Sequence, residues 1–354
     1  KRSGDVSDRH YTRLEGKFSH FQIDPHTPYH ERSSVEREVT AVVLGSGWAG
    51  IHSGLNIKLA GIDDVCVIDK AGDFGGVWYW NRYPGVACDT ESYIYMPMLE
   101  EMGVMPKANY ASGAEILAHA QAIARKYGLY ENALLQTGVT EARWDEKANR
   151  WRLTTDRGDA ITTKYFVVTA GALQTPKLPR IDGVEDFAGH CFHTSRWDYE
   201  YTGGDSSGGL SRLAGKRVAI IGTGATAIQC IPHLAQSAGH LYVVQRTPST
   251  IDVRNEHPTD KNWYISQPPG WQMERIRNFN TVTAMEPFTV DLVDDGWTDL
   301  GKRIRAQVID MPPEQRTPEG IMAAFEDADN QKMSEIRARA EAIVGGEAGE
   351  KLKA

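Results

Sequence analysis

The chain has 354 residues, a net charge of −8, 41% hydrophobic residues and 24% charged residues. This length predicts two or more domains, and the composition is that of an ordinary soluble globular protein. The negative charge argues against a nucleic-acid or anionic-membrane partner, and no apolar run approaches the ~20 residues that a membrane helix needs. The cysteines Cys66, Cys88, Cys191 and Cys230 show no paired spacing. We therefore expect free thiols in the reducing cytoplasm, and no motif predicts a metal site.

The first part of the chain predicts an arm followed by a nucleotide-binding unit. Residues 1–37 are polar, have no clear period and predict an arm that lies on a domain. Thr40–Leu44 is a short apolar run of the kind that forms a buried parallel strand. A helix over residues 48–60 follows, and then a second strand, Val65–Ile68, which ends at Asp69. This order is typical of a dinucleotide fold.

A strand-rich excursion is predicted next. Residues 72–89 form a long loop rich in Gly, Trp and Tyr, and residues 114–127 suit a helix. Charged turns separate three strands, which indicates an antiparallel arrangement. These strands are expected around residues 136–144, 150–155 and 162–169.

The second half restarts the first theme. The segment Phe187–Trp197 is dense in His, Phe and Trp, shows neither helical nor strand period, and reads as a joint. Arg217–Ile221 and Leu241–Val244 predict two further strands around a second glycine-rich loop. From about Trp271 the chain is helix-like, and Thr317 with Pro318 predicts the N-cap and first position of a helix that runs to about Val344.

These elements predict an α/β protein with two Rossmann-like domains, the second carrying a helical insertion. The expected domains are an arm (1–37), a first nucleotide-binding domain (38–180), a joint and linker (181–215) and a second nucleotide-binding domain (216–354) that is helical from about 271.

The two glycine-rich loops, residues 45–50 and 222–227, look like phosphate cradles. Glycine allows a tight turn and close approach of the backbone to a pyrophosphate, and a helix N-terminus adds partial positive charge. Asp69 lies 24 residues after Gly45, and Arg246 lies 24 residues after Gly222. A carboxylate there accepts from a ribose hydroxyl and repels a 2′-phosphate, whereas a guanidinium pairs with that phosphate. The pattern predicts a nucleotide with a free 2′-hydroxyl in the first loop and NADPH in the second; the alternative for Arg246 is a solvated arginine.

Two such domains with a strand excursion describe an FAD/NADPH flavoprotein. Disulfide reductases need a closely spaced redox cysteine pair, and Cys88 stands alone. The classes that remain are oxygen-activating monooxygenases.

Three motifs identify a family. Phe187-x-Gly189-x-x-x-His193-x-x-x-Trp197 matches the fingerprint FxGxxxHxxxW, and the loop from Gly75 to Asp89 matches GG-x-W-x-x-N-x-YPG-x-x-x-D. The run from Gln245 to Pro248 is the third. On these motifs the chain, from about Val39 to Ser249, resembles the Baeyer–Villiger monooxygenases. N- and S-oxygenating flavin monooxygenases usually end the fingerprint in Tyr or Phe.

The resemblance implies roles for individual positions. The adenosine half of FAD would be bound by Gly45, Gly47, Ala49, Gly50 and Asp69, with the backbone of Val139 at the adenine. The flavin region would be lined by Gly76, Val77, Trp78, Tyr79, Trp80, Asp89 and Tyr95, with Ala87, Cys88 and Asp89 toward the nicotinamide. NADPH would be held by Gly222, Thr223, Gly224, Ala225, Thr226, Ala227, Gln245 and Arg246.

The reaction implied by the resemblance is oxidation of a ketone to an ester or lactone, with NADPH and O2 consumed and a C4a-peroxyflavin as the oxidant. Asp89 would be the catalytic residue, tuning a flavin-facing arginine that no motif of this chain supplies; the alternative for Asp89 is turn stabilisation. His193 and Trp197 would form a hinge that couples NADP binding to domain movement, against the alternative of simple packing. Because no matching segment follows Ala354, we expect either a separate C-terminal segment as a partner or a truncated form of the protein. An N- or S-oxygenating enzyme and an inactive nucleotide-binding fragment remain alternatives.

Overall fold

The computed structural model describes residues 11–246 and 251–352. The chain divides into two compact units. The first unit comprises Lys1–Val86, Ser112–Val218 and Gln229–Tyr242. The second unit comprises Ala87–Ala111, Ala219–Ile228 and Val243–Ala354.

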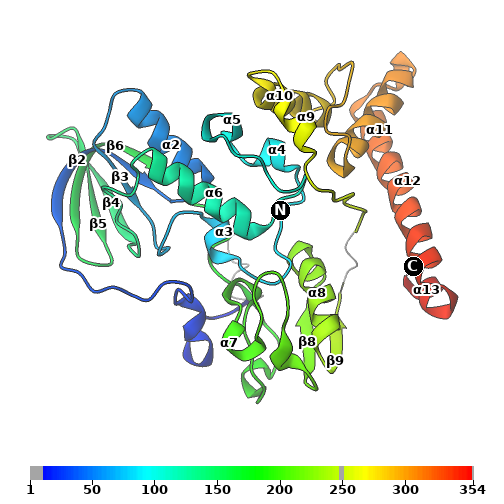
Figure 1. Ribbon diagram of the computed structural model, residues 1–354, viewed down its shortest axis with the longest axis horizontal. Helices are drawn as coiled ribbons and strands as arrows, with labels where there is room; N and C mark the ends of the chain where they lie inside the picture. Colours follow the sequence, from blue (N-terminus) through cyan, green and yellow to red (C-terminus); the bar gives the residue numbers. More distant parts are fainter. Residues whose placement is uncertain (1–10, 247–250, 353–354) are drawn as a thin grey trace. The chain divides into compact units, whose positions relative to one another are not determined.

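The first unit contains a five-stranded sheet, drawn at the left of Figure 1. Its order is β3-β2-β6-β5-β4, with β2 (Glu36–Leu44) parallel to both β3 (Val65–Ile68) and β6 (Ala160–Val168). β5 (Arg150–Thr155) pairs antiparallel with β6 and with β4 (Val139–Asp145). The expected parallel strands and antiparallel excursion are therefore confirmed. β4 begins at Val139, later than expected, because Gln136 adopts a left-handed backbone conformation with φ of 51°.

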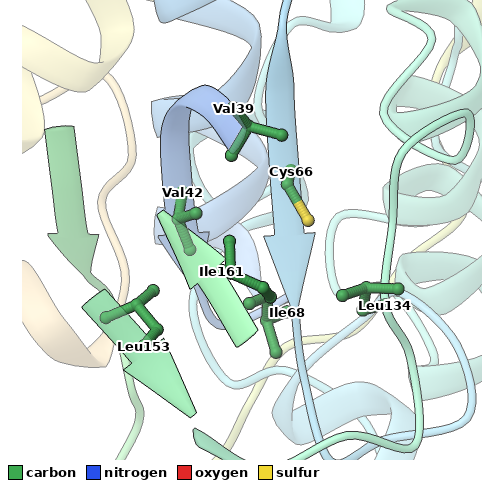
Figure 2. Close-up of a cluster of buried hydrophobic side chains, with 7 residues drawn as sticks. All are labelled: Val39, Val42, Cys66, Ile68, Leu134, Leu153 and Ile161. Atoms are coloured by element: carbon green, nitrogen blue, oxygen red, sulfur yellow. The ribbon is translucent and has the colours of Figure 1, made fainter. Parts of the chain in front are cut away.

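A buried apolar cluster, drawn in Figure 2, packs around this sheet. Strands β2, β3, β5 and β6 supply most of its side chains. Its members are Val39, Val42, Cys66, Ile68, Leu134, Leu153 and Ile161. Burial raises the pKa of the Cys66 thiol to about 11, so this cysteine is a packing residue.

Two helices lie beside each other in Figure 1, and the first of them packs on β2 and β3. They are α2 (Trp48–Leu59) and α6 (Gly113–Lys126). In α6 the Ser112 hydroxyl accepts from the N–H of Glu115 at 3.3 Å, which is an N-cap bond. Both helices lie within about one residue of the predicted ranges.

The N-terminal arm is ordered along its described part. It contains β1 (Tyr11–Thr12) and the 3-10 helix η1 (Gly16–Gln22), and β1 pairs antiparallel with β7 (Leu178–Pro179). Phe18 and Phe21 of η1 are buried with Leu178. The arm was predicted, but sequence periodicity could not show where it packs.

A second strand–loop–helix–strand run follows the joint. It consists of β8 (Arg217–Ile221), α8 (Ala225–Ser237) and β9 (His240–Val244), and β8 pairs with β9. This confirms the second Rossmann-like theme. The division between the two compact units passes through this run, whereas the predicted domain boundaries follow the motifs; those boundaries remain a prediction.

The second unit is mainly helical. Its longer helices are α10 (Trp271–Thr283), α11 (Gly296–Asp310) and α12 (Pro318–Val344), with α9 (Lys261–Ile265) before them and α13 (Gly346–Leu352) after them. α12 matches the predicted range, and the hydroxyl of its N-cap residue Thr317 accepts from the N–H of Gly320 at 3.1 Å.

Short elements complete the chain. They are α3 (Val77–Trp80), α4 (Ser92–Tyr95), α5 (Leu99–Met102), α7 (Tyr199–Thr202), and the 3-10 turns η2 (Val184–Asp186), η3 (Thr194–Arg196), η4 (Ser211–Leu213) and η5 (Pro313–Gln315). Among the described residues, no helix combines the length and the apolar character needed to cross a membrane.

Candidate cofactor-binding sites

The first glycine loop joins β2 to α2 by a tight turn. Gly45 has a φ of 118°, and its N–H donates to the carbonyl of Ile68 at 2.8 Å. A Cβ on Gly50 would lie 1.9 Å from the carbonyl oxygen of Gly45. A side chain is therefore excluded at Gly50, which is the reason this position of the motif requires glycine.

Asp69, directly after β3, is hydrogen-bonded to this loop. Asp69 is buried, and its Oδ2 accepts from the backbone N–H of Ser46 at 2.6 Å and from the Ser46 hydroxyl at 2.8 Å. Its Oδ1 accepts from the N–H of Ala71 at 2.8 Å. A carboxylate offers about four lone-pair directions, so one remains for a ligand hydroxyl.

The loop before α3 closes on the first cradle. A Cβ on Gly76 would lie 2.6 Å from the Cα of Gly47, and Gly76 has a φ of 56°. The two glycines therefore let two backbones touch at the cradle. Directly after Gly76, the side chains of Trp78, Tyr79 and Trp80 are buried.

Two observations fit a nucleotide to the first cradle. The N-cap of α2, Gly47, supplies no side-chain cap, so the first N–H groups of this helix are open to an anion. The indole Nε1 of Trp48 is buried and has no hydrogen-bond partner among residues 11–246 and 251–352. A bound group with acceptor atoms would satisfy both. Ala49 is exposed on the same turn, and Val139 is half-buried at the start of β4.

The second glycine loop repeats the turn. Gly222 has a φ of 102°, and its N–H donates to the carbonyl of Val244 at 2.8 Å. In contrast to Gly50, a Cβ on Gly224 would meet nothing within 4 Å. The second loop therefore has free space at Gly224, whereas the first loop has none at Gly50. In the rest of the loop, Ala227 is buried, Thr223 and Thr226 are half-buried, and Ala225 is exposed.

Gln245 and Arg246 follow β9 and are exposed. Asp69 comes directly after β3, whereas Arg246 comes two positions after the end of β9, so the equal sequence spacing corresponds to slightly different places. Thr247, Pro248 and Ser249, the last residues of the third motif and of the resembling stretch, lie outside the described residues.

The predicted catalytic residue, Asp89, belongs to the second unit and is exposed. Its backbone carbonyl accepts from the indole Nε1 of Trp297 at 3.0 Å. The neighbouring carbonyl of Cys88 accepts from Arg254 at 3.4 Å. These two hydrogen bonds fix the backbone at Cys88 and Asp89 without using the Asp89 carboxylate. The exposed carboxylate is therefore accessible.

Three neighbours of Asp89 carry predicted cofactor roles. Burial raises the pKa of the Cys88 thiol to about 11, which keeps it protonated. Ala87 and Tyr95 are half-buried, Tyr95 in α4. All four described cysteines are free, so none of them forms a disulfide.

The fingerprint residues are tied into their own segment. The Nδ1 of His193 accepts from the N–H of Ser195 at 3.2 Å, and burial lowers the pKa of His193. Trp197 is buried, and its Nε1 donates to the hydroxyl of Thr202 at 3.1 Å. Phe187, in contrast, is exposed. These contacts describe packing within the segment; the hinge role stays a prediction.

The sequence did not predict a contact between the fingerprint and the loop of residues 72–89 (the flavin-type loop). The guanidinium of Arg196 lies 4.2 Å from the centre of the Trp80 ring. Asp24 of the arm also reaches this loop, at Gly72 and Tyr79. The arginine inside the fingerprint, directly before Trp197, was the available sequence signal for the first contact, and no sequence pattern pointed to the second.

Comparisons with known proteins agree with this geometry. The family described as pyridine nucleotide-disulphide oxidoreductase matches residues 39–260. The neopentalenolactone D synthase of Streptomyces avermitilis is 52% identical over 95% of this chain, and the Baeyer–Villiger monooxygenase 4 of a Dietzia species is 47% identical over 91% of it. The chain spans 57% and 53% of these two relatives.

Two solved structures are similar. The polycyclic ketone monooxygenase from Thermothelomyces thermophila has a TM-score of 0.86 and 36% identity, covering 99% of this chain and 60% of that one. The complex of OTEMO with FAD and NADP has a TM-score of 0.61 and 34% identity, covering 72% of this chain and 46% of that one. With the two cradles and the fingerprint in place, the chain belongs to the family of Baeyer–Villiger monooxygenases.

Proposed function

We propose that this chain binds FAD in its first glycine loop and NADPH in its second, and takes part in the O2-dependent oxidation of ketones to esters or lactones. The observation that carries the proposal is the pair of cradles with opposite charge, Asp69 beside one and Arg246 beside the other, in a Baeyer–Villiger family member. The complex of OTEMO with FAD and NADP supports the same pair of cofactors.

FAD would lie with its pyrophosphate on the uncapped N-terminus of α2 and its ribose on the free lone pair of Asp69. Gly76 to Trp80 would line the flavin, because this loop touches the cradle at Gly47. When bound and reduced, the flavin supplies the activation of O2. The buried Trp78, Tyr79 and Trp80 would exclude water from it.

NADPH would use the open second loop. The free space at Gly224 admits a pyrophosphate, and the exposed guanidinium of Arg246 can pair with a 2′-phosphate. The remaining assigned positions of this loop, 222–227 and Gln245, would complete the contact. Arg246 would thus select NADPH over NADH.

Asp89 would act on the charge of a flavin-facing arginine. Its exposed carboxylate on a backbone-fixed turn is suited to hold a cation in one orientation. The part of the relatives that this chain does not match would supply that arginine and much of the substrate pocket, either in the same polypeptide or as a separate segment.

The experiment is a product analysis with the chain and with a version extended to the length of its relatives. Each is incubated with FAD, NADPH and a panel of monocyclic and polycyclic ketones, and esters and lactones are identified by mass spectrometry. The proposal expects NADPH-dependent lactone formation by the extended version, and an Asp89→Ala variant that consumes NADPH with little lactone. N- or S-oxides from amine or sulfide substrates, with no lactone from any ketone, would show instead an N- or S-oxygenating flavin monooxygenase.

A further inference from the structure

The described part of the N-terminal arm is fastened to the flavin-type loop by one carboxylate. The Oδ2 atom of Asp24 accepts from the N–H of Gly72 at 3.0 Å and from the hydroxyl of Tyr79 at 2.5 Å. Its Oδ1 accepts from the N–H groups of His26 at 2.8 Å and Thr27 at 3.3 Å. Four donors therefore converge on a single side chain, two from the arm and two from the loop.

The close approach of arm and loop depends on a glycine. A Cβ on Gly72 would lie 2.4 Å from the Cβ of Thr27 and 2.6 Å from the hydroxyl of Tyr79. The hydroxyls of Thr27 and Tyr79 are themselves 2.6 Å apart. Tyr79 is fully buried, so its hydroxyl depends on hydrogen bonds with Asp24 and Thr27 in place of water.

The negative charge of Asp24 favours the charged forms of two arginines, Arg82 within this loop and Arg196. The guanidinium of Arg82 lies 4.9 Å from the Tyr79 ring centre, and that of Arg196 lies 4.2 Å from the Trp80 ring centre. Arg196 is only 7% exposed, and its Nε has no hydrogen-bond partner in the described part of the chain. Burial lowers the pKa of both arginines, while the negative charge of Asp24 opposes this by favouring their charged forms.

The histidine beside these groups does not add a third charge at neutral pH. The ring of His26 meets the Tyr79 ring edge-on at 5.5 Å, and its Nε2 lies 3.3 Å from the carbonyl oxygen of Trp80. Burial, together with repulsion from Arg82, lowers the pKa of His26 to about 4. Asp24 therefore faces two cations and a neutral ring.

We propose that Asp24 is a positioning residue for the flavin-type loop. Its carboxylate fixes the Tyr79 hydroxyl and balances the positive charges of Arg82 and Arg196. In this way it holds Trp78 and Trp80 in place. The proposal rests on the FAD site of the proposed function for its effect on flavin, and on the contacts of Asp24 alone for its effect on the loop. An amide in place of the carboxylate would present N–H groups to two of the four donors and would remove the charge.

The arm has a second attachment that serves as a matched control. Arg32 donates to both carboxylate oxygens of Asp159 at 2.6 Å, and Asp159 is buried. Neither residue has a hydrogen bond to Gly72 or Tyr79 among the bonds of the described chain. We therefore expect Arg32→Gln to loosen the arm while leaving the Asp24 contacts in place.

The first test measures the loop without any cofactor. Amide hydrogen exchange over residues 72–84 is compared in the unmodified protein, Asp24→Asn and Arg32→Gln. We expect exchange about tenfold faster in Asp24→Asn and unchanged over this stretch in Arg32→Gln. Equal rates in Asp24→Asn and the unmodified protein, or an equal rise in Arg32→Gln, would overturn the proposal. Tyr79→Phe, which removes only the hydroxyl, gives the same test if Asp24→Asn does not fold.

The second test measures flavin. FAD is titrated into the apoprotein, and binding is followed by flavin fluorescence and by the visible absorption spectrum. We expect about tenfold weaker binding and a shifted spectrum for Asp24→Asn, partial recovery in Asp24→Glu, and an effect of Asp24→Asn with Tyr79→Phe smaller than the sum of the two. Additive effects, or unchanged affinity and spectrum, would contradict the role of Asp24. If the unmodified protein binds no FAD, the proposed function fails, and the exchange result alone decides on Asp24.

Discussion

Asp69 and Ser46 are joined by two hydrogen bonds: the Asp69 carboxylate accepts from the Ser46 N–H at 2.6 Å and from the Ser46 hydroxyl at 2.8 Å. The acid that ends β3 and the glycine loop that follows β2 are therefore one structural part. The conformation of the loop and the proposed contact with the FAD ribose therefore depend on the same carboxylate.

Asp69→Asn tests this coupling. The amide keeps one oxygen, so it either turns an N–H group against the donors of Ser46 or turns it toward the ribose hydroxyl in place of an acceptor. We expect FAD affinity to fall at least about tenfold, together with a lower melting temperature. Fluorescence titration and thermal unfolding measure the two effects. Asp63→Asn, at an exposed position just before β3, is the control. Unchanged FAD affinity in Asp69→Asn would refute the assignment.

The two glycine loops should respond differently to a methyl group. In Gly50→Ala the new Cβ would lie 1.9 Å from the Gly45 carbonyl oxygen, so we expect a loss of stability of about 1–3 kcal/mol or more. In Gly224→Ala the Cβ meets nothing within 4 Å, so the melting temperature should be kept while NADPH binding weakens. Thermal unfolding and NADPH titration separate the two. A Gly224→Ala variant that binds NADPH normally would argue against a pyrophosphate at this loop.

Arg246→Ala should change the choice between nicotinamide cofactors. The exposed guanidinium has a 2′-phosphate to pair with in NADPH and none in NADH. We expect the KM for NADPH to rise about tenfold to a hundredfold, with little change for NADH. Arg217→Ala, at the exposed start of β8, is the matched control. Equal effects on both cofactors would mean that Arg246 is a solvated surface residue.

His26 predicts a pH dependence of stability. Its pKa is about 4 in the folded chain against 6.5 for the free side chain, so the unfolded chain binds more protons between these values. Stability is complete above pH 6.5 and is lost as the pH falls toward 4. Between about pH 7.5 and about pH 5, the unmodified protein should lose about 1–2 kcal/mol more than His26→Gln. Denaturant unfolding at both pH values measures this, and parallel losses would contradict it.

Much of the fold could be predicted because its signals are local. The apolar runs at Thr40–Leu44 and Val65–Ile68 are buried strands, and Thr317 with Pro318 marks the start of α12. Such patterns report burial on both faces of a strand or the chemistry of a helix end, which depend on near neighbours in the sequence.

The contacts around the flavin-type loop could not be predicted in the same way. Asp24 and Tyr79 are separated by 55 residues, and Arg196 lies far from Trp80 in the chain. The arm has no periodicity that indicates a partner, and a lone acid in a largely polar segment is ordinary on a solvated surface. Tertiary packing alone reveals that this acid faces a buried hydroxyl and two arginines.

The central claim is tested most directly by the origin of the oxygen in the product. The protein, extended to the length of its relatives and loaded with FAD, is given NADPH, isotopically labelled O2 and a panel of cyclic ketones. The account predicts a lactone that carries one labelled oxygen atom and forms only when NADPH is present. Consumption of NADPH without a labelled lactone from any ketone, or labelled oxygen appearing only in N- or S-oxides, would contradict it.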